Sequence, residues 1–229
     1  IEEKAGRPTP GQNSIWLRTK DGWLQSGLVQ PVKNSQNVPV GRIPKGGMLC
    51  EVTVPFSQAW DFNRGWRRFY RCYFGSTYWV TRLFTGLNSS LWYEIYDERE
   101  RDFFAVRAQD LRPITGQELS KLSPDVSDKK IEIDLTRQRL IAFENGKPVF
   151  STRTATGLFE GTTPIGEFRI ERKQPSRHMA SNLEGNEFDL PGVPWVCYIS
   201  WTGVSFHGTY WHNNYGHTQS HGCINLTPE

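Results

Sequence analysis

The chain has 229 residues, a formal net charge of +3 and an aromatic content of 13%. This length predicts two or three domains, and so small a charge does not indicate a nucleic-acid-binding protein. Apolar runs such as residues 193–199 are far too short for a transmembrane helix. Aromatic residues, glycine and proline are plentiful and helix formers are sparse, so we expect a mainly β protein with many turns.

The first residues carry little sign of a folded element. The chain begins at Ile1 without a methionine or the apolar core of a signal peptide, which predicts a processed or trimmed fragment and leaves the compartment open. Residues 1–14 are rich in Gly, Pro, Lys and Glu, a composition typical of a linker.

A short internal repeat follows. Residues 23–32 align with residues 105–114, so that Val29 falls on Leu111 and Pro31 on Pro113. Both segments resemble the last strands of bacterial SH3-like modules. We therefore expect residues 1–35 to hold a linker and the end of a first module. Residues 38–115 would hold a complete second one, with an insertion at residues 64–88.

The second module is predicted to be a small β-barrel of short strands at residues 48–54, 68–74, 78–84 and 91–96. Such a module could target the cell wall by contacting glycan strands; alternatively, its aromatic residues only fill a small core. The basic and aromatic run at residues 64–71 could bind a polyanion, but a half-buried strand with a charged face explains it equally well.

The chain has four cysteines, too few for a disulfide scaffold. We expect buried free thiols at Cys50, Cys72 and Cys197. A bridge, if one forms, would join Cys50 to Cys72, because both lie in the same predicted domain.

Residues 116–128 read as a linker, and the pattern changes after them. Residues 130–135 alternate with period two, residues 139–143 and 148–154 follow, and Asn145-Gly146 between them is a hairpin signal. We expect a β-meander there. Residues 173–192 show no period and predict a long loop, a possible lid, before a strand at residues 193–201.

The segment from Ser205 to Leu226 carries the chemistry. Cys223 lies between a glycine and an aliphatic residue, with His207 and His221 as candidate bases. A thiol is a strong nucleophile only as thiolate, and histidine can take and return a proton near neutral pH. The sequence therefore predicts a Cys-His acyl-transfer site.

His207-Gly208 and the segment Ser220 to Asn225 together resemble the signature of the L,D-transpeptidase family with a YkuD-type catalytic domain. Thr156-Gly157 and residues 162–168 resemble further elements of that family. The resemblance covers residues 129–229 and implies a β-rich catalytic domain. Family domains continue past the position of Asn225, so we expect this one to be truncated at its C-terminus.

The resemblance implies a cysteine acyl-enzyme that joins bacterial peptidoglycan stem peptides outside the cytoplasm. It also implies a role in cell-wall biogenesis and cell shape, and acylation by carbapenems. Cys223 would attack the third residue of a tetrapeptide stem, and the amine of a second stem would then form a 3→3 crosslink. No metal or organic cofactor is needed.

The resemblance also assigns roles to residues. His207 is the expected base and then acid, and the main-chain carbonyl of Gly208 holds its other nitrogen in place of a carboxylate. Backbone N–H groups of Gly222 and Cys223, helped by His221, would stabilise the oxyanion. The expected contacts to the donor peptide come from two short segments, with Trp201, Thr202 and Gly203 in one and Ser220 and Asn225 in the other.

Several alternatives remain open at this stage. Water as the acceptor would make the protein an L,D-carboxypeptidase, and a protein amine would make it a lipoprotein-anchoring enzyme. The chain could also be a cell-wall-binding protein without activity. Finally, a zinc site could use imidazole and thiolate ligands from His207, His212, His217, His221 and Cys223.

Overall fold

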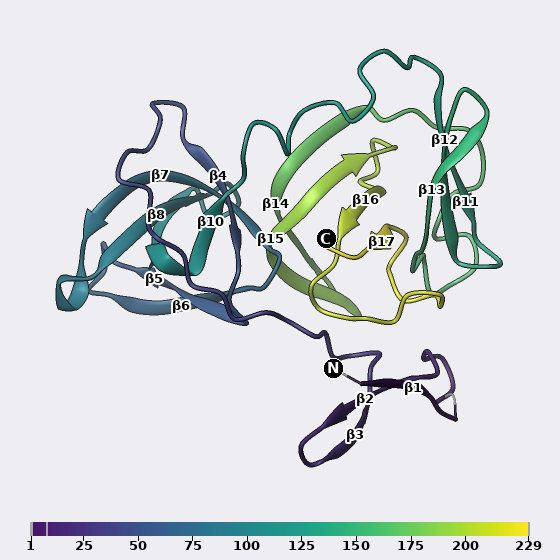
Figure 1. Ribbon diagram of the computed structural model, residues 1–229, viewed down its shortest axis with the longest axis horizontal. Helices are drawn as coiled ribbons and strands as arrows, with labels where there is room; N and C mark the ends of the chain where they lie inside the picture. Colours follow the sequence, from purple (N-terminus) through teal and green to yellow (C-terminus); the bar gives the residue numbers. More distant parts are fainter. Residues whose placement is uncertain (1, 8, 229) are drawn as a thin grey trace. The chain divides into compact units, whose positions relative to one another are not determined.

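The computed structural model describes residues 2–7 and 9–228, and its regular structure is almost entirely β-strand (Figure 1). The expected mainly β fold is thus confirmed. The chain forms two compact units. Unit 1 comprises residues 1–31, 120–173 and 197–227, and unit 2 comprises residues 32–119, 174–196 and 228–229. In the described part of the chain, no helix has the length and apolar character needed to cross a membrane.

Unit 1 begins with a small antiparallel sheet of β1 (Glu3–Ala5), β2 (Ile15–Thr19) and β3 (Gly22–Gln25). The predicted meander follows as β11 (Lys129–Asp134), β12 (Arg139–Glu144) and β13 (Lys147–Arg153), paired antiparallel in that order. Its Asn145-Gly146 turn has φ angles of 49° and 73°, the left-handed pair that a two-residue hairpin requires. The meander prediction is therefore confirmed.

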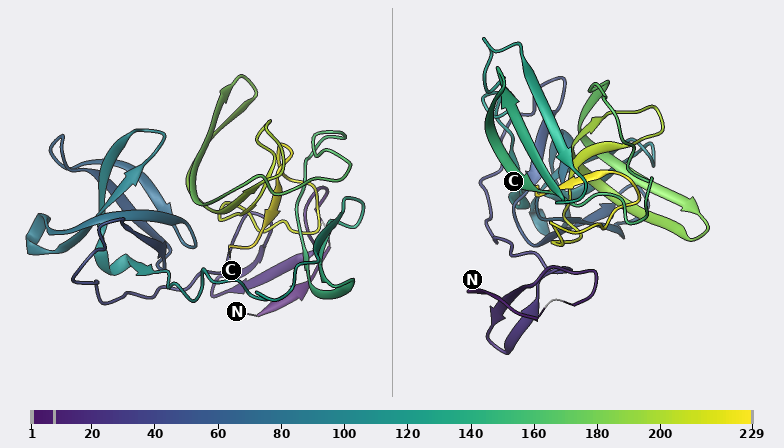
Figure 2. Two further views of the ribbon diagram at one scale, coloured as in Figure 1. Left: turned by 90° about the horizontal axis from the view of Figure 1, so that it is seen from above. Right: turned by 90° about the vertical axis from the view of Figure 1, so that its right-hand side faces the viewer.

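A further sheet has the order β14 (Arg172–Leu183), β15 (Asn186–Tyr198), β16 (Ser205–Gly208) and β17 (Ile224–Leu226). The prediction of a loop at residues 173–192 is wrong, because β14 and β15 form a long hairpin there (Figure 2). Pro175, Pro191 and Gly192 are residue types typical of loops, which is why the sequence predicted one there. Most of β14 is half-buried on both faces, so no period-two pattern marks it as a strand.

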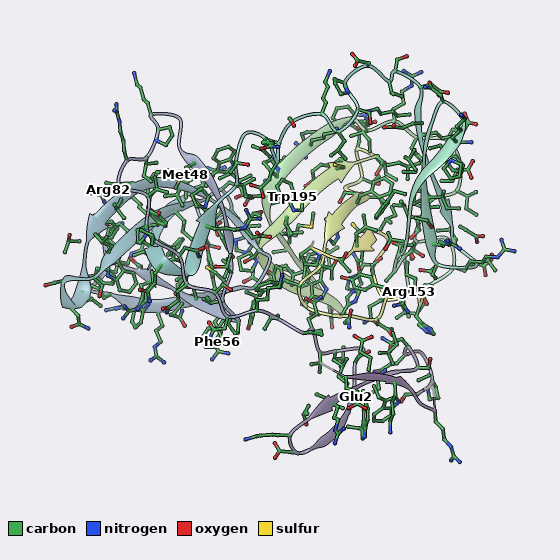
Figure 3. All side chains as sticks on the ribbon, in the orientation of Figure 1. Glu2, Met48, Phe56, Arg82, Arg153 and Trp195 are labelled. Atoms are coloured by element: carbon green, nitrogen blue, oxygen red, sulfur yellow. The ribbon has the colours of Figure 1, made fainter. Side chains whose placement is uncertain are left out.

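Unit 2 contains a sheet with the order β10-β4-β7-β8-β9-β5-β6. Met48 opens β4 and Phe56 opens β5 (Figure 3). The strands are β4 (Met48–Val52), β5 (Phe56–Asp61), β6 (Arg67–Tyr73), β7 (Thr77–Thr85), β8 (Leu91–Asp97), β9 (Asp102–Arg107) and β10 (Leu111–Pro113), with short 3₁₀ turns at Leu87–Ser89 and Ala108–Asp110. The four predicted strands correspond to β4, β6, β7 and β8. The SH3-like assignment of this region stays a prediction.

The core of unit 2 is apolar and includes two cysteines. Cys50 and Cys72 are fully buried among side chains such as Val80, Ile95 and Phe104. All four cysteines of the chain are free thiols, but Cys197, expected to be buried, is only half-buried. Burial raises the pKa of Cys50 and of Cys72 to about 12. These two thiols are therefore packing groups rather than nucleophiles.

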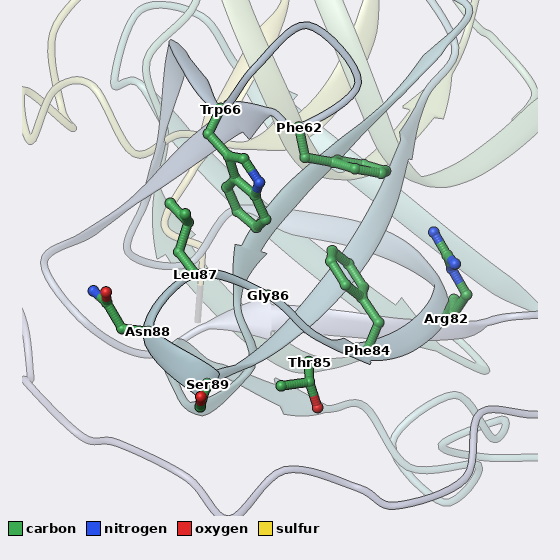
Figure 4. Close-up of a pocket in the computed structure, with 9 residues that line it drawn as sticks. All are labelled: Phe62, Trp66, Arg82, Phe84, Thr85, Gly86, Leu87, Asn88 and Ser89. Atoms are coloured by element: carbon green, nitrogen blue, oxygen red, sulfur yellow. The ribbon is translucent and has the colours of Figure 1, made fainter.

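Unit 2 also carries an open aromatic pocket of about 730 Å³ (Figure 4). Phe62 and Phe84 lie against each other, with ring centroids 5.3 Å apart, and Trp66 packs edge-on against the buried ring of Trp92 at 4.8 Å. Arg82 lines the same pocket, but its guanidinium is paired with Glu94. The aromatic residues thus extend the core of unit 2 toward its surface, and the charge of Arg82 beside them is balanced by Glu94.

The β14–β15 hairpin is attached to the strands of unit 2 by a buried charged group. Both ring nitrogens of His178 face carboxylates: Nδ1 lies 2.8 Å from Asp97 and Nε2 lies 2.7 Å from Asp189. Burial alone lowers the pKa of His178, but the hydrogen bonds with Asp97 and Asp189 raise it overall. Tyr70 also donates to Asp97, at 2.8 Å. His178 therefore acts as an imidazolium that donates to both carboxylates.

We expect His178→Ala to lower the free energy of unfolding by about 3–5 kcal/mol, because it leaves the buried Asp97 carboxylate without its cationic partner. Urea denaturation at pH 6 measures this. The control Arg177→Ala removes a half-exposed ion pair with Glu98 and should cost about 1 kcal/mol or less. Because the pKa of His178 is raised in the folded state, its contribution is complete at acidic pH and is lost as the pH rises through the folded pKa. Equal losses in both variants would contradict this prediction.

Candidate active site

Strands β16 and β17 bring the two halves of the motif together. They pair in parallel, with Phe206 opposite Ile224 and His207 opposite Asn225. Alternate residues of a strand share one face of the sheet. His207 and Asn225 therefore project from one face, and Cys223, two residues before Asn225, lies next to this face where β17 begins. The predicted meeting of the two segments depends on this parallel pairing.

His207 is buried and has two well-defined hydrogen-bond partners. Its Nδ1 lies 3.1 Å from the carbonyl oxygen of Gly208, the main-chain group that the sequence predicts. A carbonyl can only accept, so Nδ1 carries the proton and Nε2 has the free lone pair. That lone pair accepts from the Nδ2 amide of Asn225 at 3.0 Å. Burial lowers the pKa of His207 to about 4, so the ring is neutral at physiological pH.

The thiol of Cys223 has different partners. Its Sγ lies 3.7 Å from Oγ of Ser205 and 3.8 Å from the carbonyl oxygen of Gly203. Burial raises the pKa of Cys223, so the group is a thiol rather than a preformed thiolate. The parallel pairing thus places His207 beside the strand that Cys223 precedes, while their hydrogen bonds go to Asn225 for His207 and to Ser205 and Gly203 for Cys223.

The predicted oxyanion segment is a tight turn. Gly222 has a φ of 139° and its N–H donates to Oγ of Ser220 at 3.0 Å, while that hydroxyl donates to the carbonyl of Cys223 at 2.6 Å. Ser220, expected to contact substrate, is buried and shapes the turn instead. His221 is exposed. In this geometry the amide of Gly222 is directed to Ser220, so accepting an oxyanion would require it to change partner.

The turn before β16 presents the remaining predicted contacts. Trp201 is 92% exposed, and the hydroxyls of Ser200 and Thr202 lie 2.8 Å apart. Gly203, with a φ of 97°, directs its carbonyl toward the Cys223 thiol. Trp201, Thr202 and Gly203 thus belong to a turn beside Cys223. Asn225 is 2% exposed and is bound by two histidines, so its side chain faces the interior rather than solvent.

The upstream threonine-glycine elements pack against the motif. Gly157 forms an isolated bridge with Ser220 and donates its N–H to Oγ1 of Thr163, whose hydroxyl donates to the carbonyl of Gly222 at 2.9 Å. The resemblance in sequence gave these residues no individual role. In the structure, the Thr163 hydroxyl holds the turn that precedes Cys223.

Gly222→Ala is expected to lower the rate of acylation at Cys223 at least tenfold, because a Cβ there would lie 2.6 Å from the backbone oxygen of Thr162 and would displace the turn. Gly216→Ala is the matched control. Gly216 also has a positive φ, 96°, but its Cβ would meet only the side chain of Arg153, at 3.4 Å. Both variants should lose roughly 1–3 kcal/mol of stability from backbone strain. Acylation kinetics separate them, and equal rates would contradict the prediction.

The zinc alternative has no assembled ligand set. Across residues 2–7 and 9–228, no three His, Cys, Asp or Glu side chains gather as a metal site requires. His207 and His212 instead hydrogen-bond to Asn225.

Comparisons with known proteins show what the C-terminal part of the chain is similar to. Residues 128–229 match the family model of YkuD, the L,D-transpeptidase catalytic domain. "L,D-transpeptidase 1" of Mycobacterium tuberculosis is 30% identical over 92 residues, which cover 37% of this chain and 37% of that protein. The chain thus aligns with little more than a third of this relative.

Two solved structures are also similar in sequence. A crystal structure of an Enterococcus faecium L,D-transpeptidase is 31% identical, covering 45% of this chain and 43% of that one, with a TM-score of 0.40. The catalytic domain of an E. faecium L,D-transpeptidase acylated by ertapenem is 32% identical, covering 44% and 82%, with a TM-score of 0.38. The family match rests on the sequence of residues 128–229 and not on these superpositions. Residues 128–229 are therefore similar to the YkuD catalytic domain of L,D-transpeptidases, and this similarity covers slightly less than half of the chain.

Proposed function

We propose that this protein is a cysteine-dependent L,D-transpeptidase that acts outside the bacterial cytoplasm and forms 3→3 crosslinks between peptidoglycan stem peptides. The observation that carries the proposal is the state of His207. Its proton is held on Nδ1 by the carbonyl of Gly208, which leaves the Nε2 lone pair available as a base on β16, the strand that pairs with the one that Cys223 precedes. A neutral imidazole with a basic Nε2 is what general-base activation of a thiol requires.

In the first half-reaction, Sγ of Cys223 attacks the carbonyl carbon of the third stem residue. A C–S bond forms, the thiol proton moves to Nε2 of His207, and the carbonyl oxygen becomes an oxyanion. When this intermediate collapses, the C–N bond to D-alanine breaks, and the departing amine takes the proton from Nε2. Both groups are neutral beforehand, so proton transfer accompanies the attack. Nε2 must exchange the Asn225 amide for the thiol at this step.

In the second half-reaction, the side-chain amine of another stem attacks the thioester. A C–N bond forms, the C–S bond breaks, and Nε2 takes the amine proton and returns it to the sulfur. Water in place of the amine would give an L,D-carboxypeptidase, and a protein amine would give an anchoring enzyme. All three share one acyl-enzyme at Cys223. Residues 38–115 would contact glycan strands as an SH3-like module.

Intact-protein mass spectrometry after exposure to a carbapenem tests the proposal, followed by incubation of fresh enzyme with disaccharide-tetrapeptides. We expect one carbapenem adduct on the peptide that contains Cys223, release of D-alanine, and 3→3 linked dimers. Tripeptide monomers without dimers would favour the carboxypeptidase. Absence of both adduct and D-alanine release would overturn the proposal in favour of a cell-wall-binding protein without activity.

A further inference from the structure

We propose that the N-terminal segment of residues 11–30 contributes to the active site, because its hydrogen bonds hold the loop of residues 209–214 in position. Through that loop, His212 and Asn225 become positioning residues for His207. This inference rests on the proposed function, since it concerns the base of that reaction. The segment lies outside residues 128–229, which match the catalytic-domain family.

A chain of hydrogen bonds connects the loop to the catalytic imidazole. The backbone N–H of Asn214 donates to Nδ1 of His212 at 3.2 Å, so the proton of His212 lies on Nε2. That Nε2–H donates to Oδ1 of Asn225 at 3.0 Å, which fixes the orientation of the amide. Nδ2 of Asn225 then donates to Nε2 of His207, and Nδ1–H of His207 donates to Gly208. Every donor in the chain meets an acceptor, so one set of tautomers satisfies all four contacts.

Burial makes this network sensitive to the loss of any member. His212 and Asn225 are each 2% exposed, Asn214 is 1% exposed and His207 is 3% exposed. Water cannot easily replace a missing partner there, and an unsatisfied buried polar group is costly. Burial also lowers the pKa of His212, only partly opposed by Asn225, so both imidazoles are neutral. The Asn225 amide disfavours protonation of Nε2 on His207 and holds the ring in one plane.

The N-terminal segment holds the loop at several points. The backbone N–H of Asn13 donates to Oδ1 of Asn214 at 2.7 Å, and its side-chain amide donates to the carbonyl of Asn213 at 2.9 Å. The side-chain amide of Asn214 in turn donates from Nδ2 to the carbonyl of Gly11 at 2.9 Å. Asn13 is itself 2% exposed, so these contacts lie in the interior of unit 1.

Gln30 holds the other part of the loop. Its Nε2 donates to the carbonyl of Thr209 at 2.7 Å and to that of His212 at 2.5 Å. The N–H of Asn213 donates to the carbonyl of Gly27 at 2.8 Å. Residues 11–30 thus fix the backbone on both sides of His212, which determines where its Nε2–H points.

The test compares Asn13→Ala, His212→Leu and His212→Gln in the full chain. Rates of carbapenem acylation are measured against pH by mass spectrometry. We expect Asn13→Ala and His212→Leu to be acylated roughly tenfold or more slowly than the unchanged protein. The acid limb of their rate profile should rise from about pH 4 but stay below the ordinary histidine value of 6.5. The released Asn225 amide no longer opposes protonation of Nε2, whereas burial still lowers the pKa of His207. His212→Gln keeps an N–H donor and should recover most of the rate.

Glu2→Ala, which removes the exposed ion pair between Glu2 and Arg18 without changing any residue of the segment 11–30, is the control and should leave rate and pH profile unchanged. Nitrogen-15 NMR of the unchanged protein provides a readout that needs neither turnover nor a variant. We expect His207 protonated on Nδ1 and His212 on Nε2. The opposite tautomers, or folded Asn13→Ala and His212→Leu with unaltered rate and pH profile, would overturn the inference. Lack of any acylation at Cys223 with the expected tautomers would instead defeat the proposed function.

Discussion

Cys223→Ala is expected to abolish carbapenem adduct formation and to lower crosslinking by on the order of 10⁴-fold or more. The reason is chemical: no other group in the site can form the thioester, since the Ser205 hydroxyl beside the sulfur is a far weaker nucleophile. Intact mass spectrometry measures the adduct, and separation of the stem-peptide products measures crosslinking.

The matched control is Cys197→Ala. Cys197 is a free thiol in the same unit, half-buried on β15, and burial raises its pKa as well. It should lose neither the adduct nor crosslinking. An adduct that survives in Cys223→Ala but disappears in Cys197→Ala would identify Cys197 on β15 as the nucleophile and refute the assignment of Cys223.

His207→Ala is expected to reduce both activities by roughly 10²–10⁴-fold, the usual contribution of a general base. The contribution of His207 to the pH dependence of folding stability also has a predictable direction. Because the folded pKa of His207 is about 4, below the ordinary value of 6.5, the group's stabilising contribution is complete above about pH 6.5 and is lost as the pH falls toward 4. The unchanged protein should therefore lose more stability over this window than His207→Ala does.

His217→Gln is the control for this second prediction. His217 is half-exposed, lies between His207 and Cys223 in sequence, and was a candidate ligand in the zinc alternative. We expect its activity to equal that of the unchanged protein, with no metal in either sample by elemental analysis. Stoichiometric zinc, lost together with activity in His217→Gln, would reverse the choice between the two chemistries.

Local patterns predicted much of the fold. Residues 130–135 alternate and Asn145-Gly146 takes a left-handed turn because strand period and turn chemistry depend on neighbours in the chain. The β14–β15 hairpin could not be found this way. Pro175 and Gly192 hide its pattern, and its contacts go to Asp97 and Tyr78 of distant strands.

The same distinction between local sequence and distant contacts applies to the functional residues. The sequence by itself determined the candidate groups, His207 and Cys223, because a short motif specifies residue types and their order. The family resemblance implied the Gly208 carbonyl as a partner of His207, and the fold places it there. Only the tertiary structure decided their partners. The bond between Asn13 and Asn214 joins residues 201 positions apart, and nothing near either one marks it as buried. Burial arises when distant segments exclude water together, so the network that orients the imidazole is a property of the folded chain.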